Sequence, residues 1–253
     1  VHTVPWVGKP ERSLQDDIWE LYNIDEDFSL TNNLAKKHPE KLKELQDLFE
    51  KEAIANNVYP LDDRLYERFN AALAGRPDLM GPRTSLTLAQ GATGLLENTF
   101  INEKNTSKTI VANVDLKGND RGVILCQGGK FGGWVLYMDQ GKPAYTYNYF
   151  GLERYTIVSP NAITNKNAEI KLQFDYDGGG TGKGGKATLY VEGEKVAEGR
   201  VDKTQPAVYS ADETADVGQD DATPVADHVF EDSKDTEFTG NVKSVTISIP
   251  ERK

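Results

Sequence analysis

The sequence predicts a mainly β protein: an antiparallel β-sandwich in residues 83–253, preceded by a small helical α+β segment in residues 1–82. Two observations carry this prediction. After residue 83, apolar residues recur at every second position in many short runs, which is the period of half-buried strands. Before residue 82, one run has apolar residues at every third or fourth position, which is the period of an amphipathic helix. Pro77, Gly81 and Pro82 interrupt both patterns, so we expect the domain boundary there.

The first region contains one clear helix, in residues 39–53 (PEKLKELQDLFEKEA). Proline suits its first turn, because the N–H that proline lacks would be unpaired there. One apolar stripe follows at helical spacing: Leu42, Leu45, Leu48, Phe49 and Ala53. A second short helix is predicted at residues 61–74, and a strand or extended segment at residues 18–24. The region is too small to bury its aromatic residues alone, so we expect it to need a partner surface.

The second region contains nine predicted strands, separated by turn signals such as Gln140-Gly141 and Glu192-Gly193. They lie at residues 109–116, 122–127, 134–139, 144–150, 154–159, 169–177, 187–193, 195–201 and 242–249. Many short strands with no helical pattern between them are typical of antiparallel sandwiches and jelly rolls.

Composition excludes several classes of function. The formal charge of −11 argues against nucleic acid as a partner, because phosphate binding needs clustered lysine and arginine. No apolar run approaches the roughly 18–20 residues of a membrane-spanning helix, so no membrane partner is expected. The single cysteine, Cys126, excludes an internal disulfide framework and a multi-cysteine zinc site.

Four aromatic residues form a candidate ligand site. Tyr145, Tyr147 and Tyr149 alternate along one predicted strand and therefore share one of its faces. Trp134 lies on a neighbouring strand, so the four rings can form a platform on which a sugar or aryl ligand stacks. A sandwich core, or a face that docks another domain, explains the same stripe, and this alternative stays open.

A second candidate site is the acidic loop ADVGQDDATPVAD, residues 215–227. Asp216, Asp220, Asp221 and Asp227 can supply several hard oxygen ligands to a calcium ion. The alternative is a solvated acidic loop without a metal.

The first region also resembles a known family. Trp19-Glu20-Leu21-Tyr22-Asn23, then Asn33-Leu34-Ala35, then Pro39-Glu40-Lys41-Leu42 resemble the closing segment of bacterial arylsulfatases of the alkaline-phosphatase superfamily. The second region, with GGKFGGWVLYMDQGKPAYTYNYFGLER, is similar to the C-terminal extension of the longer members. That extension has a concanavalin A-like or laminin-G-like fold, so the resemblance implies this form of β-sandwich.

The resemblance implies a non-catalytic, C-terminal part of an arylsulfatase. Sulfatases use a formylglycine made from Cys or Ser in the motif C/S-x-P-x-R, and calcium polarises the sulfate. Cys126 is followed by Gln-Gly-Gly-Lys and does not match. Ser248-Ile249-Pro250-Glu251-Arg252 matches only formally, one residue before the chain ends, so we interpret it as a coincidence. The nucleophile and calcium ligands are therefore expected upstream of this chain.

The partners that follow are the sulfatase catalytic domain and, through it, a sulfated aryl or carbohydrate ester. Self-association through the apolar faces of residues 1–82 is a further expectation. The resemblance to bacterial sulfatases implies that this chain lies in the periplasm or is secreted, rather than in the cytoplasm. The alternative function is a calcium-dependent, carbohydrate-binding β-sandwich module.

Overall fold

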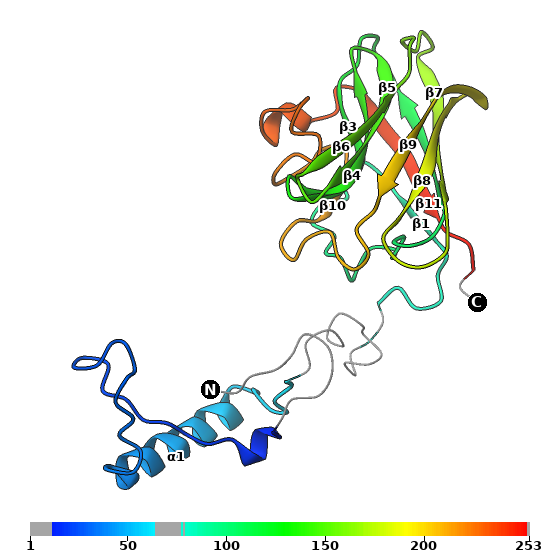
Figure 1. Ribbon diagram of the computed structural model, residues 1–253. Coiled ribbons are helices and arrows are strands. Elements are labelled where there is room, and N and C mark those ends of the chain that lie inside the picture. Colours follow the sequence, from blue (N-terminus) through cyan, green and yellow to red (C-terminus); the bar gives the residue numbers. More distant parts are fainter. Residues whose placement is uncertain (1–11, 64–76, 78, 252–253) are drawn as a thin grey trace. The chain divides into compact units, whose positions relative to one another are not determined.

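The computed structural model describes residues 12–63, 77 and 79–251. The chain forms two compact units, Val1–Pro77 and Asp78–Lys253 (Figure 1). In the described part of the chain, no helix has both the length and the apolarity needed to cross a membrane.

The first unit contains the short 3-10 helix η1 (Leu14–Asp16) and the helix α1 (Pro39–Ala55). The helix expected at residues 39–53 is confirmed, and it begins at the proline as predicted. Residues 18–24 pair with no strand, although the backbone N–H of Leu34 donates to the carbonyl of Leu21 at 2.7 Å. Of the second helix, expected at residues 61–74, residues 64–74 lie outside the described residues.

The second unit is an antiparallel β-sandwich, which confirms the predicted fold class and all nine predicted strands. The first sheet has the order β1-β11-β2-β7-β8-β9 and the second the order β10-β3-β4-β5-β6 (Figure 1). The strands of the first sheet are β1 (Ser85–Leu88), β11 (Asn241–Ser248), β2 (Lys108–Asp115), β7 (Asn167–Tyr176), β8 (Lys183–Val191) and β9 (Glu194–Lys203). Those of the second are β10 (Ala215–Val217), β3 (Gly122–Gly129), β4 (Gly132–Asp139), β5 (Lys142–Tyr149) and β6 (Glu153–Val158).

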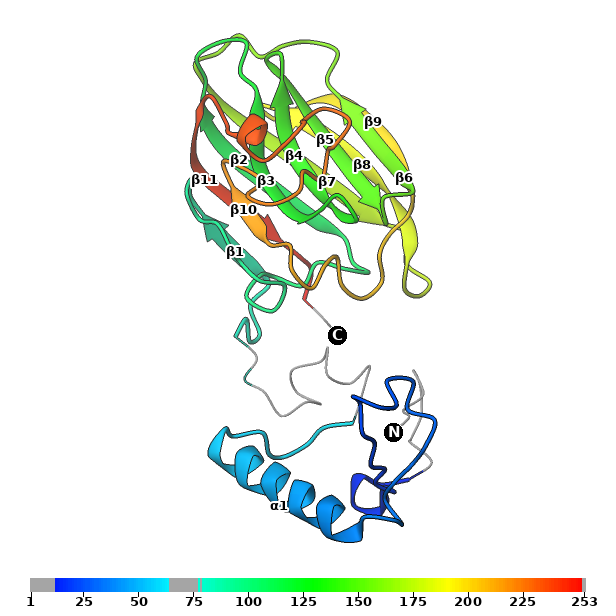
Figure 2. The same ribbon diagram turned by 90° about the vertical axis from the view of Figure 1, so that its left-hand side faces the viewer.

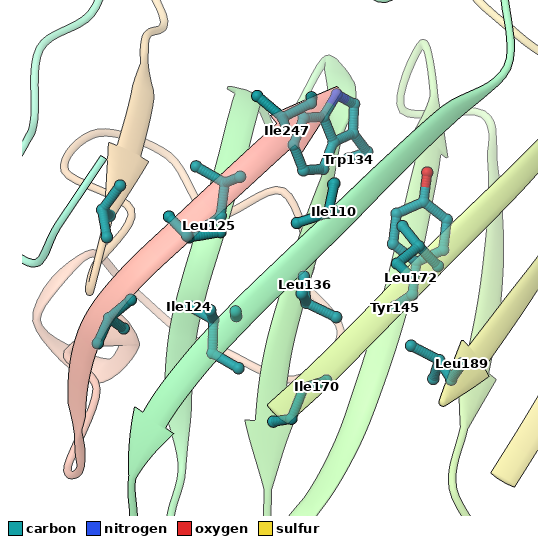
Figure 3. Packing of buried hydrophobic residues seen from close by; sticks show 14 of the residues in the cluster. Ile110, Ile124, Leu125, Trp134, Leu136, Tyr145, Ile170, Leu172, Leu189 and Ile247 are labelled. Atoms are coloured by element: carbon teal, nitrogen blue, oxygen red, sulfur yellow. The ribbon is translucent and has the colours of Figure 1, made fainter. Parts of the chain in front are cut away.

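The main core lies between the two sheets. Ile110 and Ile170 from the first sheet face Leu125, Leu136 and other apolar residues of the second (Figure 3). All are fully buried. Burying them removes a large apolar area from water, which is the main force that holds the sheets together.

A second apolar cluster lies on the outer face of the five-stranded sheet. There the segment 218–240, which contains the 3-10 helix η3 (Lys234–Thr236), crosses in front of β3, β4 and β5 (Figure 2). Phe230 of this covering segment packs edge-on against Tyr137 of β4, with ring centroids 5.5 Å apart. The side chain of Arg121 holds the segment through an ion pair with Asp235. Strands β3 and β4 are therefore buried on both faces.

Candidate metal centre

The aromatic stripe predicted from the sequence lies in the core rather than on a surface. Trp134, Tyr145 and Tyr147 are 0–1% exposed, and all three point into the space between the sheets. Trp134 and Tyr145 are seen there in Figure 3. Tyr149 is half-buried and packs against the same core. The shared face of the tyrosines is thus confirmed, but a ligand cannot stack on rings without exposed faces, and the stacking platform is corrected to sandwich core.

Two of the four predicted aspartates meet in a buried cluster. Asp216 of β10 lies directly across from Cys126 of β3, and Asp220 follows where the covering segment begins. Directly opposed residues of neighbouring strands point to the same side of the sheet. One ligand atom of Asp216, one of Asp220 and the Cys126 sulfur all lie within 4.8 Å of one another, and all three residues are buried.

Hydrogen bonds fix the Asp216 carboxylate and leave the Asp220 carboxylate partly unpaired. Asp216 accepts the backbone N–H of Gly94 at 2.7 Å on Oδ1 and the Thr214 hydroxyl at 3.0 Å on Oδ2. Asp220 Oδ2 accepts the backbone N–H of Val225 at 2.9 Å. Its other oxygen, Oδ1, is buried and has no hydrogen-bond partner among the described residues. A buried carboxylate oxygen without a hydrogen-bond partner lowers the stability of the fold, so we expect this atom to bind a ligand.

The electrostatics of the pair point the same way. The pKa of Asp220 is raised to about 8, mainly by burial and also by the nearby charges of Asp216, Glu213 and Asp221, while the hydrogen bond from Val225 lowers it. Burial also raises the pKa of Asp216 to about 6. No lysine or arginine pairs with either carboxylate in the described part of the chain. A bound cation would supply the missing positive charge.

The other two predicted aspartates have different roles. Asp221 is exposed and lies at the edge of the cluster, where its Oδ1 accepts the Thr214 hydroxyl at 3.2 Å. Asp227 instead forms a two-bond ion pair with Arg154, in which the second bond is 2.8 Å long. The expectation that Asp227 is a ligand is therefore wrong, because a guanidinium already neutralises its carboxylate.

Among the residues that the structure describes, neither Cys126 nor Ser248 forms a catalytic arrangement. Burial raises the pKa of the Cys126 thiol well above its ordinary value, so the sulfur is a poor nucleophile. The Ser248 hydroxyl lies 3.2 Å from the Ser85 hydroxyl, which cannot act as a general base. Arg252, the last residue of the formal sulfatase motif, lies outside the described residues.

Three exposed apolar residues lie at the tips of two hairpins and were not predicted from the sequence as candidate site residues: Phe131, Phe150 and Leu152. A usable signal was present, since a bulky apolar residue stands directly before glycine in the turn Phe150-Gly151. The polar residues Gln140 and Glu192 occupy the same place in other hairpins.

Fold and site together define an antiparallel β-sandwich with a buried acidic cluster on the outer face of one sheet. The sequence matches no known protein-family model and no curated protein. Among solved structures, it is similar to the Ruminococcus gnavus IT-sialidase CBM40, with 15% identity, a TM-score of 0.43, and coverage of 68% of this chain and 92% of that chain. Another similar structure is that of the mouse laminin alpha1 chain, domains LG4-5, with 10% identity and a TM-score of 0.38. The match covers 69% of this chain and 41% of that chain. Similarity at this level carries no information about a ligand.

Proposed function

We propose that this chain is a β-sandwich module that binds calcium and, with it, carbohydrate. The observation that carries the calcium site is the unpaired Oδ1 of Asp220 beside the Asp216 carboxylate, in a buried position without a compensating cation among the described residues. Carboxylate and carbonyl oxygens are the ligands that calcium prefers, and it completes its six to eight ligands with water. The Gln219 carbonyl, 3.6 Å from the Cys126 sulfur, adds one more oxygen at the same place.

The donor set favours calcium over zinc. Zinc prefers thiolate and imidazole ligands, whereas this cluster offers two carboxylates and one thiol, and no histidine joins it among the described residues. The choice of carbohydrate is supported by the exposed aromatic rings of Phe131 and Phe150, because aromatic faces suit the apolar faces of sugar rings.

Calcium binding is tested with the variant Asp220→Asn and the control Asp227→Asn. We expect calcium to raise the melting temperature of the chelator-treated wild type by several degrees. A free calcium concentration of about 100 times the dissociation constant stabilises the folded state by about 2.7 kcal/mol. Asp220→Asn keeps the acceptor for Val225, removes one charge beside Asp216, and should fold but no longer respond to calcium. Asp227→Asn removes one charge outside the cluster and should respond like the wild type.

Calorimetric unfolding and titration with calcium, magnesium and zinc measure both effects. A wild type that gives neither heat nor a temperature shift with calcium would overturn the metal site. So would an Asp220→Asn variant that binds calcium as tightly as the wild type. Tighter binding of zinc than of calcium would overturn the choice of metal.

A second candidate function keeps the arylsulfatase resemblance: the chain is a non-catalytic part that packs on a sulfatase catalytic domain, in the periplasm or outside the cell. The observation that favours it is the exposure of large apolar residues in the first unit. They include Ile18, Trp19, Ile24, Phe28, Leu45, Leu48, Phe49 and Ile54. In α1 only Ala53 is buried, and Leu45, Leu48 and Phe49 are each more than one third exposed, so this part of the apolar stripe is available to a partner, either that domain or a second copy of this chain.

This candidate predicts that the purified chain does not hydrolyse an aryl sulfate by itself. With p-nitrophenyl sulfate and calcium, the release of p-nitrophenol should equal the background, and Ser248→Ala should behave identically. Turnover that disappears in Ser248→Ala would show that Ser248 is a nucleophile and would refute a non-catalytic role.

A further inference from the structure

Two neighbouring hairpin turns of the five-stranded sheet expose large apolar side chains. Phe131, in the β3–β4 turn, is 71% exposed; Phe150 and Leu152, in the β5–β6 turn, are 44% and 78% exposed. We call these three residues the hairpin-tip patch. The turns are adjacent, because a Cβ on Gly151 would lie 3.8 Å from the Phe131 ring. The patch therefore presents two aromatic rings and one leucine at one end of one sheet.

Buried hydrogen bonds hold these turns in place. The side-chain amide of Asn148, which is fully buried, donates to the Lys130 carbonyl at 2.9 Å and to the Val225 carbonyl at 3.2 Å. Its oxygen accepts the backbone N–H of Gly151 at 2.8 Å. Asn148 thus ties both turns to the covering segment. A rigid apolar surface loses little conformational entropy when a ligand binds.

The backbone at Phe150 is a second, independent observation. Phe150 and Gly151 both have positive φ, 52° and 71°, which is the conformation of a type I′ turn. Two other turns of this sandwich have the same conformation, and there the first residue is polar: Gln140 before Gly141, and Glu192 before Gly193. A bulky side chain is disfavoured at positive φ, and such strain is concentrated at functional positions. The Phe150 ring packs edge-on against Tyr149, with ring centroids 4.8 Å apart, and still leaves 44% of the residue exposed.

The size of the patch decides between kinds of partner. Its exposed area is about 400 Å², half of the roughly 800 Å² that each partner buries in a stable protein interface. This area is closer to that covered by a few sugar rings of an oligosaccharide than to the area that a folded protein partner covers.

The charges around the patch favour an acidic ligand. Arg154 is neutralised by Asp227, and Lys203 by Glu153 at 2.9 Å. Lys130, which directly precedes Phe131, is exposed and forms no ion pair within the described residues. An uncompensated lysine beside two aromatic rings suits a sugar that carries a negative charge.

We propose that the hairpin-tip patch binds an acidic sugar, whose ring stacks on Phe131 and Phe150 and whose carboxylate or sulfate faces Lys130. This inference rests on the carbohydrate part of the proposed function and adds the surface and the ligand class.

Titration calorimetry at physiological salt with three hexasaccharides tests it: one derived from heparin (sulfated and carboxylated), one from hyaluronan (carboxylated only), and maltohexaose (neutral). We expect the wild type to bind at least one acidic hexasaccharide at least fivefold more tightly than maltohexaose. Phe131→Ala and Phe150→Asn should each weaken that binding at least fivefold, and Lys130→Gln should remove the preference for the acidic sugar.

Phe150→Asn separates a binding role from a structural one. Asn-Gly is favoured in type I′ turns, so this variant should melt about 1–3 °C above the wild type while it binds the sugar less well. Gln140→Asn makes the same kind of change in the β4–β5 turn, at the opposite end of these strands, and should leave binding unchanged.

The outcomes distinguish this inference from the function on which it rests. If the wild type binds an acidic hexasaccharide and the Phe131 and Phe150 variants bind it equally well, the patch is wrong while the carbohydrate function stands. If the wild type binds none of the three, both fail, and the calcium site is still judged by its own titration. Equal binding of neutral and acidic hexasaccharides would overturn the role of Lys130.

Discussion

Replacing Glu103 by glutamine is expected to lower the free energy of unfolding of the sandwich by about 3–5 kcal/mol. Glu103 Oε2 accepts the Lys108 ammonium at 2.7 Å, and both side chains are 2% exposed. Its Oε1 accepts the indole N–H of Trp134 at 2.9 Å. Glutamine cannot neutralise Lys108, so it leaves a buried positive charge without its partner.

The electrostatics explain why this pair tolerates burial. Burial raises the pKa of Glu103, but the attraction of Lys108 and Lys104 more than offsets this, so its pKa lies below the ordinary value. Lys104 in turn pairs with Glu97. The ammonium of Lys108 also lies 4.2 Å from the centre of the Trp134 ring, a cation–π contact that depends on the same geometry.

Urea unfolding followed by circular dichroism measures this loss, with Glu198→Gln as the control. Glu198 pairs with Lys195 at 3.1 Å on the exposed face of β9. Losing this exposed ion pair should lower the free energy of unfolding by less than about 1 kcal/mol. The double variant Glu103→Gln, Lys108→Met removes both charges and should cost less than the sum of the single changes. A Glu103→Gln variant as stable as Glu198→Gln would contradict a buried, charged pair.

Much of the sandwich could be predicted from the sequence, because strand periodicity is local. The two missed strands are short: β1, and the three-residue β10 inside an acidic stretch that resembles a loop. Ala215–Val217 is a strand because it pairs with Cys126 and its neighbours, and the sequence pattern contains no information about that partner.

The roles of the candidate residues depend on long-range packing, which a local pattern does not contain. Alternation placed Tyr145 and Tyr147 on one face of a strand but could not identify the core side, because the covering segment also buries the other face. The same limit applies to the aspartates. Asp227 meets Arg154, 73 positions earlier, while Asp220 is buried without a cation among the described residues.

Replacing Trp134 by alanine is the second change with a large expected effect, a loss of about 3–5 kcal/mol in the free energy of unfolding. The ring is fully buried between the sheets, 6.4 Å from the Phe100 ring, and its N–H is bonded to Glu103. Alanine leaves a cavity and removes one partner of the buried ion-pair network, so the two costs add to each other.

This variant also separates the core from the ligand surface. Phe131→Ala, at a ring that is 71% exposed, should change stability by no more than about 0.5 kcal/mol and yet weaken sugar binding. Trp134→Ala should do the opposite under conditions where it remains folded: it unfolds at lower urea, while its affinity for the acidic hexasaccharide stays within about twofold of the wild type. If Trp134→Ala were folded and as stable as the wild type but no longer bound the acidic hexasaccharide, Trp134 would have a role in stacking on the sugar, which its burial argues against. Because Trp134 and Glu103 are in contact, their combined replacement should cost less than the two single losses together, which would show that one network stabilises this part of the sandwich.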